Sequence, residues 1–505
     1  MELFESRHKF FGVVSKLFLE NISIDAMKCL GLRCAQSDMN LTDLLDKTAG
    51  RWPNKPALIE GTTVVSYAEL VQKSNQLAAQ LKSFPLSHGA RVGLCCPNSI
   101  DYVALTFALW RIHAVVVPIP TECAEEEILN MAVTMCLDAI ISQKPRQTSS
   151  LLSNFFLTKL SPPKKADNHG LNIAFIRFTS GTTSACKGVV LCHETIRDRV
   201  AASNKSLRIG PDDTVMWCLP MSHHFLVTIV LYLSVGATIV LARHVLAKMF
   251  LDAVDRARGT VLYAAPFHYA LLARDGSGTK IPSVRLAVST TCKLPQDISD
   301  DFFKRFDRPL TQALGLIELG LPCVNVDDPL HRWNSVGRPQ PDYAVLIRHP
   351  DADGYGEIVV AGPGFFDAYD NPWTPREQLM PDGWFATGDI GRLDEDGYLF
   401  LAGRKAAVIN VAGRKIFPEE IEAVLNRHPA VQESRVFGVP HAHLGETVEA
   451  EAVLGKTATP DELRDFCRKH LSVEKIPSRI QLVSQIARTA VTGKIRRPPA
   501  LATAA

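Results

Sequence analysis

From about residue 40 to residue 400, short apolar runs alternate with longer segments whose apolar residues recur at helical spacing. One unit has an apolar run at 91–95, a helical pattern from 100 to 112 and a second apolar run at 114–117. Further apolar runs lie at 260–264 and 284–288. Apolar strands that alternate with helices are typical of parallel sheets covered on both faces. The pattern therefore predicts an α/β fold with doubly wound, mostly parallel sheets.

After Gly403 the pattern changes to a mixture of half-exposed strands and short amphipathic helices. Helices are expected at 419–428 and 460–471, and strands at 435–439 and 449–454. This predicts a small α+β domain that is separate from the large one. We expect a large domain at 41–403, a small domain at 404–505 and an N-terminal extension at 1–40.

Two apolar segments invite a membrane interpretation. Residues 225–242 carry no charge, but Gly236 and the β-forming residues after it predict a buried helix, turn and strand. Phe10, Val14, Leu17 and Phe18 have helical spacing in the extension. We favour a helix packed on the protein's own surface over one that docks on a partner or a membrane.

Composition narrows the class of protein. The 505 residues have a formal net charge of +2, which gives no electrostatic argument for nucleic acid or an anionic membrane. The 12 cysteines form no paired CxxC framework, so we expect reduced thiols, no zinc site and a cytoplasmic protein.

The first candidate for chemistry is the loop Arg177-Phe178-Thr179-Ser180-Gly181-Thr182-Thr183-Ser184-Ala185-Cys186-Lys187-Gly188, which follows an apolar strand. Small residues allow backbone N–H groups to approach an anion, while the hydroxyls and one ammonium add donors, so polyphosphate is the expected ligand. It is not a Walker loop, because glycine follows the lysine. Taken alone, such a segment is more often an ordinary loop.

Four further motifs follow in order. They are Gln312-Ala313-Leu314-Gly315-Leu316-Ile317-Glu318, Trp384-Phe385-Ala386-Thr387-Gly388-Asp389, the segment 403–422 that joins the two domains, and the segment 488–497 around Lys494. Each has an ordinary alternative: Glu318 as a solvated turn acid, Asp389 as a turn cap, and Lys494 as a surface lysine. All five motifs in this order are very hard to obtain by chance.

Through these motifs the chain resembles the adenylate-forming superfamily: acyl-CoA synthetases, aryl acid ligases, luciferases and the adenylation domains of peptide synthetases. The resemblance covers about residues 41–497. It implies that a carboxylic acid and ATP give an acyl adenylate and pyrophosphate, after which a thiol takes the acyl group and releases AMP. Because the acid and ATP are both anionic, such a site must supply positive charge and alignment.

The resemblance also implies residue roles. Glu318 would ligate Mg²⁺, Asp389 and Arg404 would hold the ribose, and Lys494 would bridge the substrate carboxylate and ATP oxygens. His223 would be a gate beside the acyl group, although a core histidine is an equal alternative. The residues expected around the nucleotide and its phosphates are Thr179, Ser180, Gly181, Thr182, Thr183, Lys187 and Gly315.

The two steps would require the small domain to move. Lys494 and the phosphate loop lie in different domains, so adenylation needs closure, followed in the family by rotation about Lys405-Ala406. Small residues at Ala412-Gly413 would admit a pantetheine arm. No carrier-domain sequence follows Lys494. The thiol must come in trans, from coenzyme A, which we slightly favour, or from a carrier protein.

The segments expected to line the acyl pocket are 220–225, 289–294 and 313–320. They are mostly apolar or small and favour an apolar fatty or aryl acid. Leu226 follows Phe225 where peptide-synthetase relatives have an amino-group anchor, which disfavours an α-amino acid.

Some positions depart from the family pattern: Ser184, Cys186, Leu314, Ile317 and Ala406. They leave open a catalytically silent nucleotide-binding relative, and a luciferase-like or amide-forming enzyme is a further alternative. The charged residues Lys187, Glu318, Asp389, Arg404 and Lys494 are all present, which favours an active enzyme.

Overall fold

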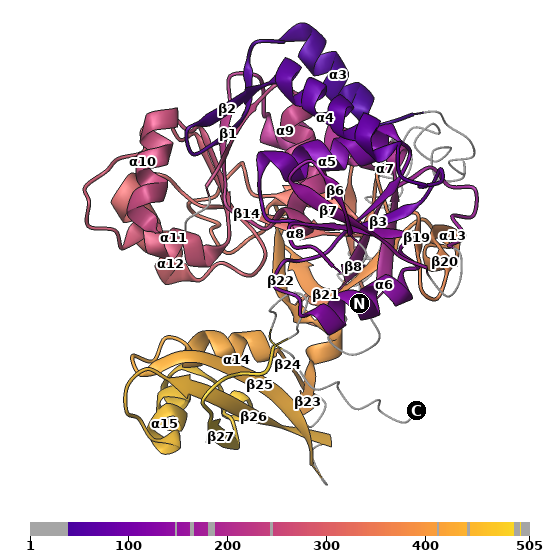
Figure 1. Cartoon of the computed structure of the whole chain (residues 1–505). Helices are drawn as coiled ribbons and strands as arrows, with labels where there is room; N and C mark the ends of the chain where they lie inside the picture. Colours follow the sequence, from indigo (N-terminus) through magenta and orange to yellow (C-terminus); the bar gives the residue numbers. More distant parts are fainter. Residues whose placement is uncertain are drawn as a thin grey trace, which may run out of the picture.

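The computed structural model describes residues 39–146, 149–161, 166–179, 187–242, 246–411, 414–441, 445–488 and 495. Within them the chain forms two nine-stranded sheets, a four-stranded sheet and a five-stranded sheet, with helices between and around the large sheets (Figure 1). This confirms the predicted α/β class with a large and a small domain.

The first large sheet has the order β20-β19-β9-β8-β4-β3-β5-β7-β6, and its centre, β8 to β5, is parallel. The predicted apolar runs at 91–95 and 114–117 are its strands β3 and β4. Its strands are β3 (Arg91–Cys95), β4 (Val115–Pro118), β5 (Ala139–Ser142), β6 (Ser149–Leu152), β7 (Phe155–Lys159), β8 (Ile173–Thr179), β9 (Lys187–Cys192), β19 (Ala368–Tyr369) and β20 (Thr374–Pro375).

The second large sheet has the order β16-β15-β14-β13-β12-β10-β11-β1-β2 and is parallel from β14 to β1. The runs at 260–264 and 284–288 correspond to β12 and β13. Its strands are β1 (Pro56–Glu60), β2 (Thr63–Ser66), β10 (Thr214–Trp217), β11 (Thr238–Leu241), β12 (Val261–Ala264), β13 (Leu286–Ser289), β14 (Thr311–Leu316), β15 (Gly320–Val324) and β16 (Arg338–Pro339).

Helix α5 and its neighbours join the two sheets into one core. Helix α5 is buried along nearly its whole length, and one hydrophobic cluster includes Phe107 of α5, Phe175 of the first sheet and Trp217 of the second. Apart from the helical segment at 221–234, the described helices of the large domain are α3 (Thr42–Arg51), α4 (Tyr67–Leu81), α5 (Ile100–Arg111), α6 (Glu125–Thr134), α7 (His193–Leu207), α10 (Ala247–Ala257), α11 (Pro266–Ala273), α12 (Gln296–Phe306) and α13 (Arg376–Leu379).

The uncharged segment 225–242 folds as predicted. An α-helical turn, α8 (Met221–His224), continues through a π-helical segment, η1 (Phe225–Ile229), into α9 (Val230–Ser234). Gly236 then turns at φ +82°, where a Cβ would lie 2.5 Å from the Trp52 ring, and β11 follows. In the part of the chain that the structure describes, no helix is long and apolar enough to cross a bilayer.

A four-stranded antiparallel sheet, which the sequence pattern did not predict, ends the large domain. Its order is β17-β18-β21-β22. The strands are β17 (Ala344–Arg348), β18 (Gly356–Ala361), β21 (Phe385–Leu393) and β22 (Leu399–Arg404). The alternating pattern of the sequence predicts further strands and helices of the large sheets in this region instead.

The small domain has a sheet and a hydrophobic core of its own, and in Figure 1 it lies beneath β21 and β22. The helix expected at 460–471 is α15, which begins at Pro460 as predicted, and the Thr459 side chain caps it. Its elements are η2 (Lys405–Ala407), β23 (Ile409–Val411), β24 (Arg414–Ile416), α14 (Pro418–Leu425), β25 (Val431–His441), β26 (Gly445–Leu454), α15 (Pro460–His470), η3 (Val473–Lys475) and β27 (Arg479–Leu482). The predicted N-terminal helix at 10–18 lies outside the described residues.

Candidate active site

Strands β8 and β9 bring together the two ends of the expected phosphate loop. They are antiparallel, and Thr179, the last residue of β8, pairs with Lys187, the first residue of β9. Ser180, Gly181, Thr182 and Thr183 lie outside the described residues, as do the departures Ser184 and Cys186. The described strands therefore fix where the loop begins and ends, and the phosphate contacts stay a prediction.

Lys187 and Glu318 are connected through an aromatic residue that sequence reasoning missed. The Lys187 ammonium lies 4.9 Å from the ring centroid of Tyr369, on the neighbouring strand β19. The Tyr369 hydroxyl donates a hydrogen bond of 3.2 Å to Glu318 Oε1. Burial raises the pKa of Tyr369, and the Glu318 carboxylate adds to the shift, so the hydroxyl stays protonated as a donor. The Tyr369 side chain thus contacts both the Lys187 ammonium and the Glu318 carboxylate of the predicted site.

The turn that carries Glu318 is held in place by a buried arginine of α7. Arg199 is 1 % exposed, and its guanidinium donates to the carbonyl oxygens of Ile317 (2.7 Å), Glu318 (3.0 Å) and Gly364 (2.9 Å). Burial lowers the pKa of Arg199 to about 10, which leaves it charged at neutral pH. Gly320 (φ +90°) packs on this side chain so closely that a Cβ would lie 2.5 Å from it. The backbone on both sides of Glu318 is therefore rigidly placed.

Asp389 and Arg404 are paired across the β21–β22 hairpin. Arg404 Nε lies 2.8 Å from Asp389 Oδ1, and Arg404 Nη1 donates to the Thr387 carbonyl oxygen (3.2 Å). Gly388 turns at φ +72°, and the Asp389 N–H donates to Thr387 Oγ1 (3.0 Å). The Asp389 side chain is mostly buried while that of Arg404 is half exposed. The geometry offers one hydrogen-bonding carboxylate and one accessible guanidinium; contact of either with ribose stays a prediction.

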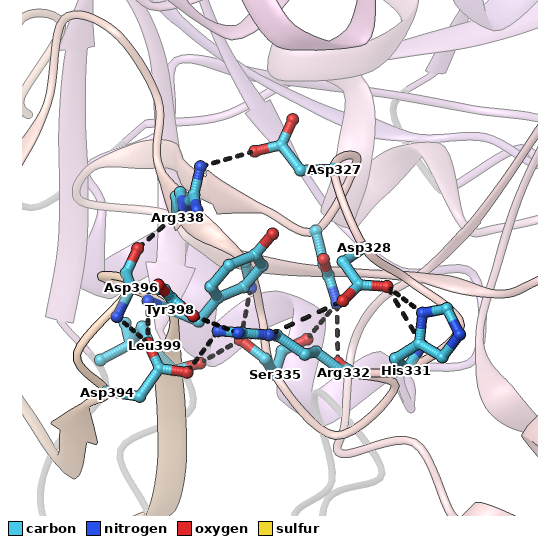
Figure 2. Close-up of polar contacts among 12 residues, drawn as sticks. Asp327, Asp328, His331, Arg332, Ser335, Arg338, Asp394, Asp396, Tyr398 and Leu399 are labelled. Carbon is cyan, nitrogen blue, oxygen red and sulfur yellow. Dashed lines mark hydrogen bonds and ion pairs between the residues drawn. The ribbon is translucent and has the colours of Figure 1, made fainter.

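The turn between β21 and β22, at the other end of the same hairpin, forms ion pairs with the loop between β15 and β16 of the second large sheet. Figure 2 shows Arg332, in the loop between β15 and β16, reaching Asp394 (2.6 Å), Asp396 and, at 3.7 Å, Asp328. The Arg332 guanidinium also lies 4.2 Å from the Tyr398 ring centroid. We attribute a positioning role to this cluster: it orients the hairpin that carries Asp389 and Arg404.

His223 belongs to α8, directly before the π-helical segment. A π-helical segment commonly marks a functional position in a helix. The preceding turn is fixed by Asn98, whose side chain donates to the Leu219 carbonyl oxygen (2.7 Å) and accepts from the Met221 N–H (2.7 Å). The His223 side chain is partly exposed, and its gate role stays a prediction.

The predicted small-domain residues are only partly described. Lys494, Ala412 and Gly413 lie outside the described residues. At the expected rotation point, Lys405 pairs with Glu357 of β18 at 2.9 Å, and Ala406 lies in η2. Gly315 lies in β14, at a register irregularity between Leu314 and Leu316.

No group of three or more His, Cys, Asp or Glu residues that could hold a metal ion occurs among the described residues. A single carboxylate such as Glu318 suits Mg²⁺, which usually keeps waters and takes its remaining ligands from substrate phosphates. The hydrogen bond from Tyr369 engages one carboxylate oxygen, Oε1, and orients the group.

Comparison with known proteins decides the family. The profile of the AMP-binding enzyme matches residues 45–370, and that of the AMP-binding enzyme C-terminal domain matches residues 420–494. The chain belongs to the AMP-binding enzyme family. The resemblance stated from the motifs is thereby confirmed, since the match covers both domains.

Relatives of this AMP-binding enzyme match over most of their length. It is 28 % identical over 501 residues to an oxalate–CoA ligase of Arabidopsis thaliana, covering 90 % of this chain and 97 % of the relative. It is 29 % identical over 506 residues to a crotonobetaine/carnitine–CoA ligase of Salmonella typhimurium, covering 90 % and 98 %. The solved o-succinylbenzoate CoA synthetase of Bacillus subtilis, in complex with its acyl-adenylate intermediate, superposes with a TM-score of 0.79 at 23 % identity, covering 92 % and 98 %. That structure supports the fold.

Proposed function

We propose that this AMP-binding enzyme is an ATP-dependent acid–thiol ligase, which adenylates a carboxylic acid and transfers the acyl group to coenzyme A. The observation that carries the proposal is the linked array of Lys187 at the start of β9, Tyr369 of β19 and Glu318 in the turn after β14. Two of the relatives named above are CoA ligases, and the match with this chain covers 97 % and 98 % of their length. This similarity supports the same reaction type and acceptor.

The array suits this chemistry because both reactants are anionic. Lys187 supplies a compact positive charge where the phosphate loop ends. Glu318 would hold Mg²⁺, which neutralises phosphate charge when bound. Asp389 and Arg404 would fix the ribose and so the direction of the α-phosphate. In the proposed first step the acid's carboxylate oxygen bonds to the α-phosphorus and pyrophosphate leaves.

Transfer to the thiol needs the small domain. We propose that Lys494 bridges the acid and ATP during adenylation and is withdrawn when the domain rotates near Lys405. The thiol of coenzyme A then attacks the acyl carbon, AMP leaves, and the thiol proton passes to solvent. A carrier-protein phosphopantetheine is the alternative acceptor for the same step.

The experiment that tests the proposal is acid-dependent ATP–pyrophosphate exchange without thiol, over fatty, aryl and short polar acids. We expect exchange with one class of acid, and an acyl-CoA detectable by mass spectrometry once coenzyme A is added. Lys494→Ala should lower exchange at least about 100-fold while ATP still binds, because a charge that acts mainly in the transition state is removed. Lys469→Ala, at an exposed lysine of α15, is the matched control. Absence of exchange with every acid, with ATP binding intact, would contradict the proposal and favour the silent relative.

A further inference from the structure

Arg177 is a charged residue in the interior of the first large sheet. It lies on β8, between β9 and β4, two residues before Thr179. Its neighbours along the strand are apolar and buried: Ile176 is 0 % exposed and Phe178 is 5 % exposed. Arg177 itself is partly accessible, although its neighbours on the strand are buried.

Among the described residues, the Arg177 guanidinium has no hydrogen-bond or ion-pair partner. Its Nε is buried and has no hydrogen-bond acceptor, and Arg177 forms no ion pair with a described residue. Its strongest attractive charge interaction is with the Glu318 carboxylate. Burial lowers the pKa of Arg177 to about 10, so the group is still cationic at neutral pH. A buried N–H donor of a charged group that lacks an acceptor is costly to the free protein.

A second unused donor lies near Arg177. Tyr102 of α5 is 0 % exposed, and its buried hydroxyl has no hydrogen-bond partner in the described part of the chain. The Tyr102 ring lies 5.6 Å from the ring of Phe225, the last residue of the segment 220–225 expected to line the acyl pocket. Asn98, just before α5, is hydrogen-bonded to that same segment. Arg177 therefore has in its neighbourhood both Glu318 and Tyr102, and the Tyr102 ring packs against the acyl-lining segment.

These two donors require an acceptor that the described residues do not supply. Among the described residues, Glu318 is the carboxylate with the strongest effect on the pKa of Arg177. Under the proposed function, however, the Glu318 carboxylate binds Mg²⁺. An anionic oxygen group from a ligand would satisfy the guanidinium and the hydroxyl together. An arginine is well suited to that task because its planar N–H donors match a carboxylate or sulfonate.

We propose that Arg177, assisted by Tyr102, binds a second anionic group of the acid substrate, so that the enzyme activates a short dicarboxylic or sulfonated acid. One carboxylate of such an acid faces ATP and the other anionic group faces Arg177. This rests on the proposed function, and it replaces the apolar acid expected from the lining segments with an acid that carries a charge at its far end. A phosphate of ATP is the competing source of the same anionic chemistry.

The test compares diacids with monoacids of equal chain length in ATP–pyrophosphate exchange: malonate with propionate and succinate with butyrate. The wild-type protein should have the higher kcat/KM for at least one diacid. Arg177→Met should lower the diacid-to-monoacid ratio of kcat/KM about 100-fold, the effect of losing a buried charge-assisted interaction. Tyr102→Phe should lower the ratio by a smaller factor. Arg197→Met, at an exposed arginine of α7, should leave the ratio as in wild type.

Two further measurements separate this role from a structural one. Because the buried Nε of Arg177 has no acceptor among the described residues, Arg177→Met should have an unfolding temperature equal to or above that of wild type, whereas loss of a structural arginine would lower it. ATP affinity, measured by calorimetry, should change less than the diacid ratio. Loss of ATP affinity with an unchanged ratio would assign Arg177 to the phosphates and overturn the proposal.

The same experiment distinguishes the two proposals. Exchange that shows the same diacid-to-monoacid ratio in wild type and Arg177→Met overturns the diacid proposal and leaves the ligase standing. Absence of exchange with every acid overturns both.

Discussion

At the scale of single residues, Tyr369 shows how one aromatic side chain can serve two opposite charges. Its ring faces the Lys187 ammonium at 4.9 Å, and its hydroxyl donates to Glu318 at 3.2 Å. Neither the residue nor the contacts could be predicted from sequence, because Tyr369 is 51 positions from Glu318 and lies in an ordinary-looking strand. The residues that carry formal charge were recognisable as motifs, whereas the neutral residue between them was not.

Tyr369→Phe separates the two contacts. The ring stays under Lys187, but Glu318 loses its hydrogen-bond donor and so its fixed orientation. Since a hydrogen bond to a charged group contributes about 1.5–3 kcal/mol, we expect the apparent affinity for Mg²⁺ in the exchange reaction to fall by about 10-fold or more. Tyr369→Leu should in addition raise the KM for ATP, because the cation–π contact with Lys187 is lost. An Mg²⁺ titration that is identical for wild type and Tyr369→Phe would contradict the positioning role.

At the scale of elements, the strands that were predicted best are those with the simplest pattern. Apolar runs such as 91–95 are buried on both faces, so composition alone distinguishes them. The antiparallel sheet of β17, β18, β21 and β22 was missed because its strands are half-exposed and separated by turns of varied length. Asp389 was still identified, because the motif around it is local, but the hairpin that pairs it with Arg404 was not.

The turn that carries Glu318 depends on α7 through contacts that span 118 and 119 residues. No local pattern reveals such a contact. In the sequence Arg199 looks like one more polar residue of an amphipathic helix. The structure shows instead that it satisfies three carbonyl oxygens, which is the reason that a charged side chain can be buried at this position.

Arg199→Met therefore tests whether the turn that carries Glu318 depends on α7 for its position. The substitution keeps the apolar stem but leaves the carbonyl oxygens of Ile317, Glu318 and Gly364 without this donor. We expect a loss of about 2–4 kcal/mol in the free energy of unfolding and a large loss of exchange activity, because Glu318 is misplaced. Denaturant unfolding and exchange should be measured together with Arg197→Met as control. Full activity in a destabilised Arg199→Met protein would show that the turn is held by other contacts.

At the scale of the whole molecule, a long-range contact ties the start of the described chain to the core. The Leu41 N–H donates to Nδ1 of His193, the first residue of α7, at 3.1 Å, so this nitrogen is unprotonated. His193 is 1 % exposed and lies edge-on to Trp110 of α5. Burial lowers the pKa of His193 to about 3, and His113 acts in the same direction. The large domain therefore folds around a neutral histidine.

This predicts that the free energy of unfolding falls in acid, because the unfolded chain binds a proton that the folded protein does not. The unfolded chain protonates His193 near its ordinary pKa of about 6.5, whereas the folded protein does so only near 3. Between these values the unfolded state binds more protons, so stability rises with pH. The contribution of His193 is complete above about pH 6.5 and is lost progressively toward pH 3. At pH 5.5 the loss is about 1.4 kcal/mol relative to pH 8.

His193→Asn is the variant that isolates this effect. Its side-chain oxygen can still accept from the Leu41 N–H, but it has no proton to gain in this range. We expect wild type to lose more stability than His193→Asn between pH 8 and pH 5.5, by about 1.4 kcal/mol in chemical unfolding. His349→Asn, at an exposed position with φ 49° that asparagine tolerates, should follow wild type at both pH values. Parallel pH profiles for wild type and His193→Asn would place the acid sensitivity elsewhere, since a histidine that is protonated equally in both states contributes no pH dependence.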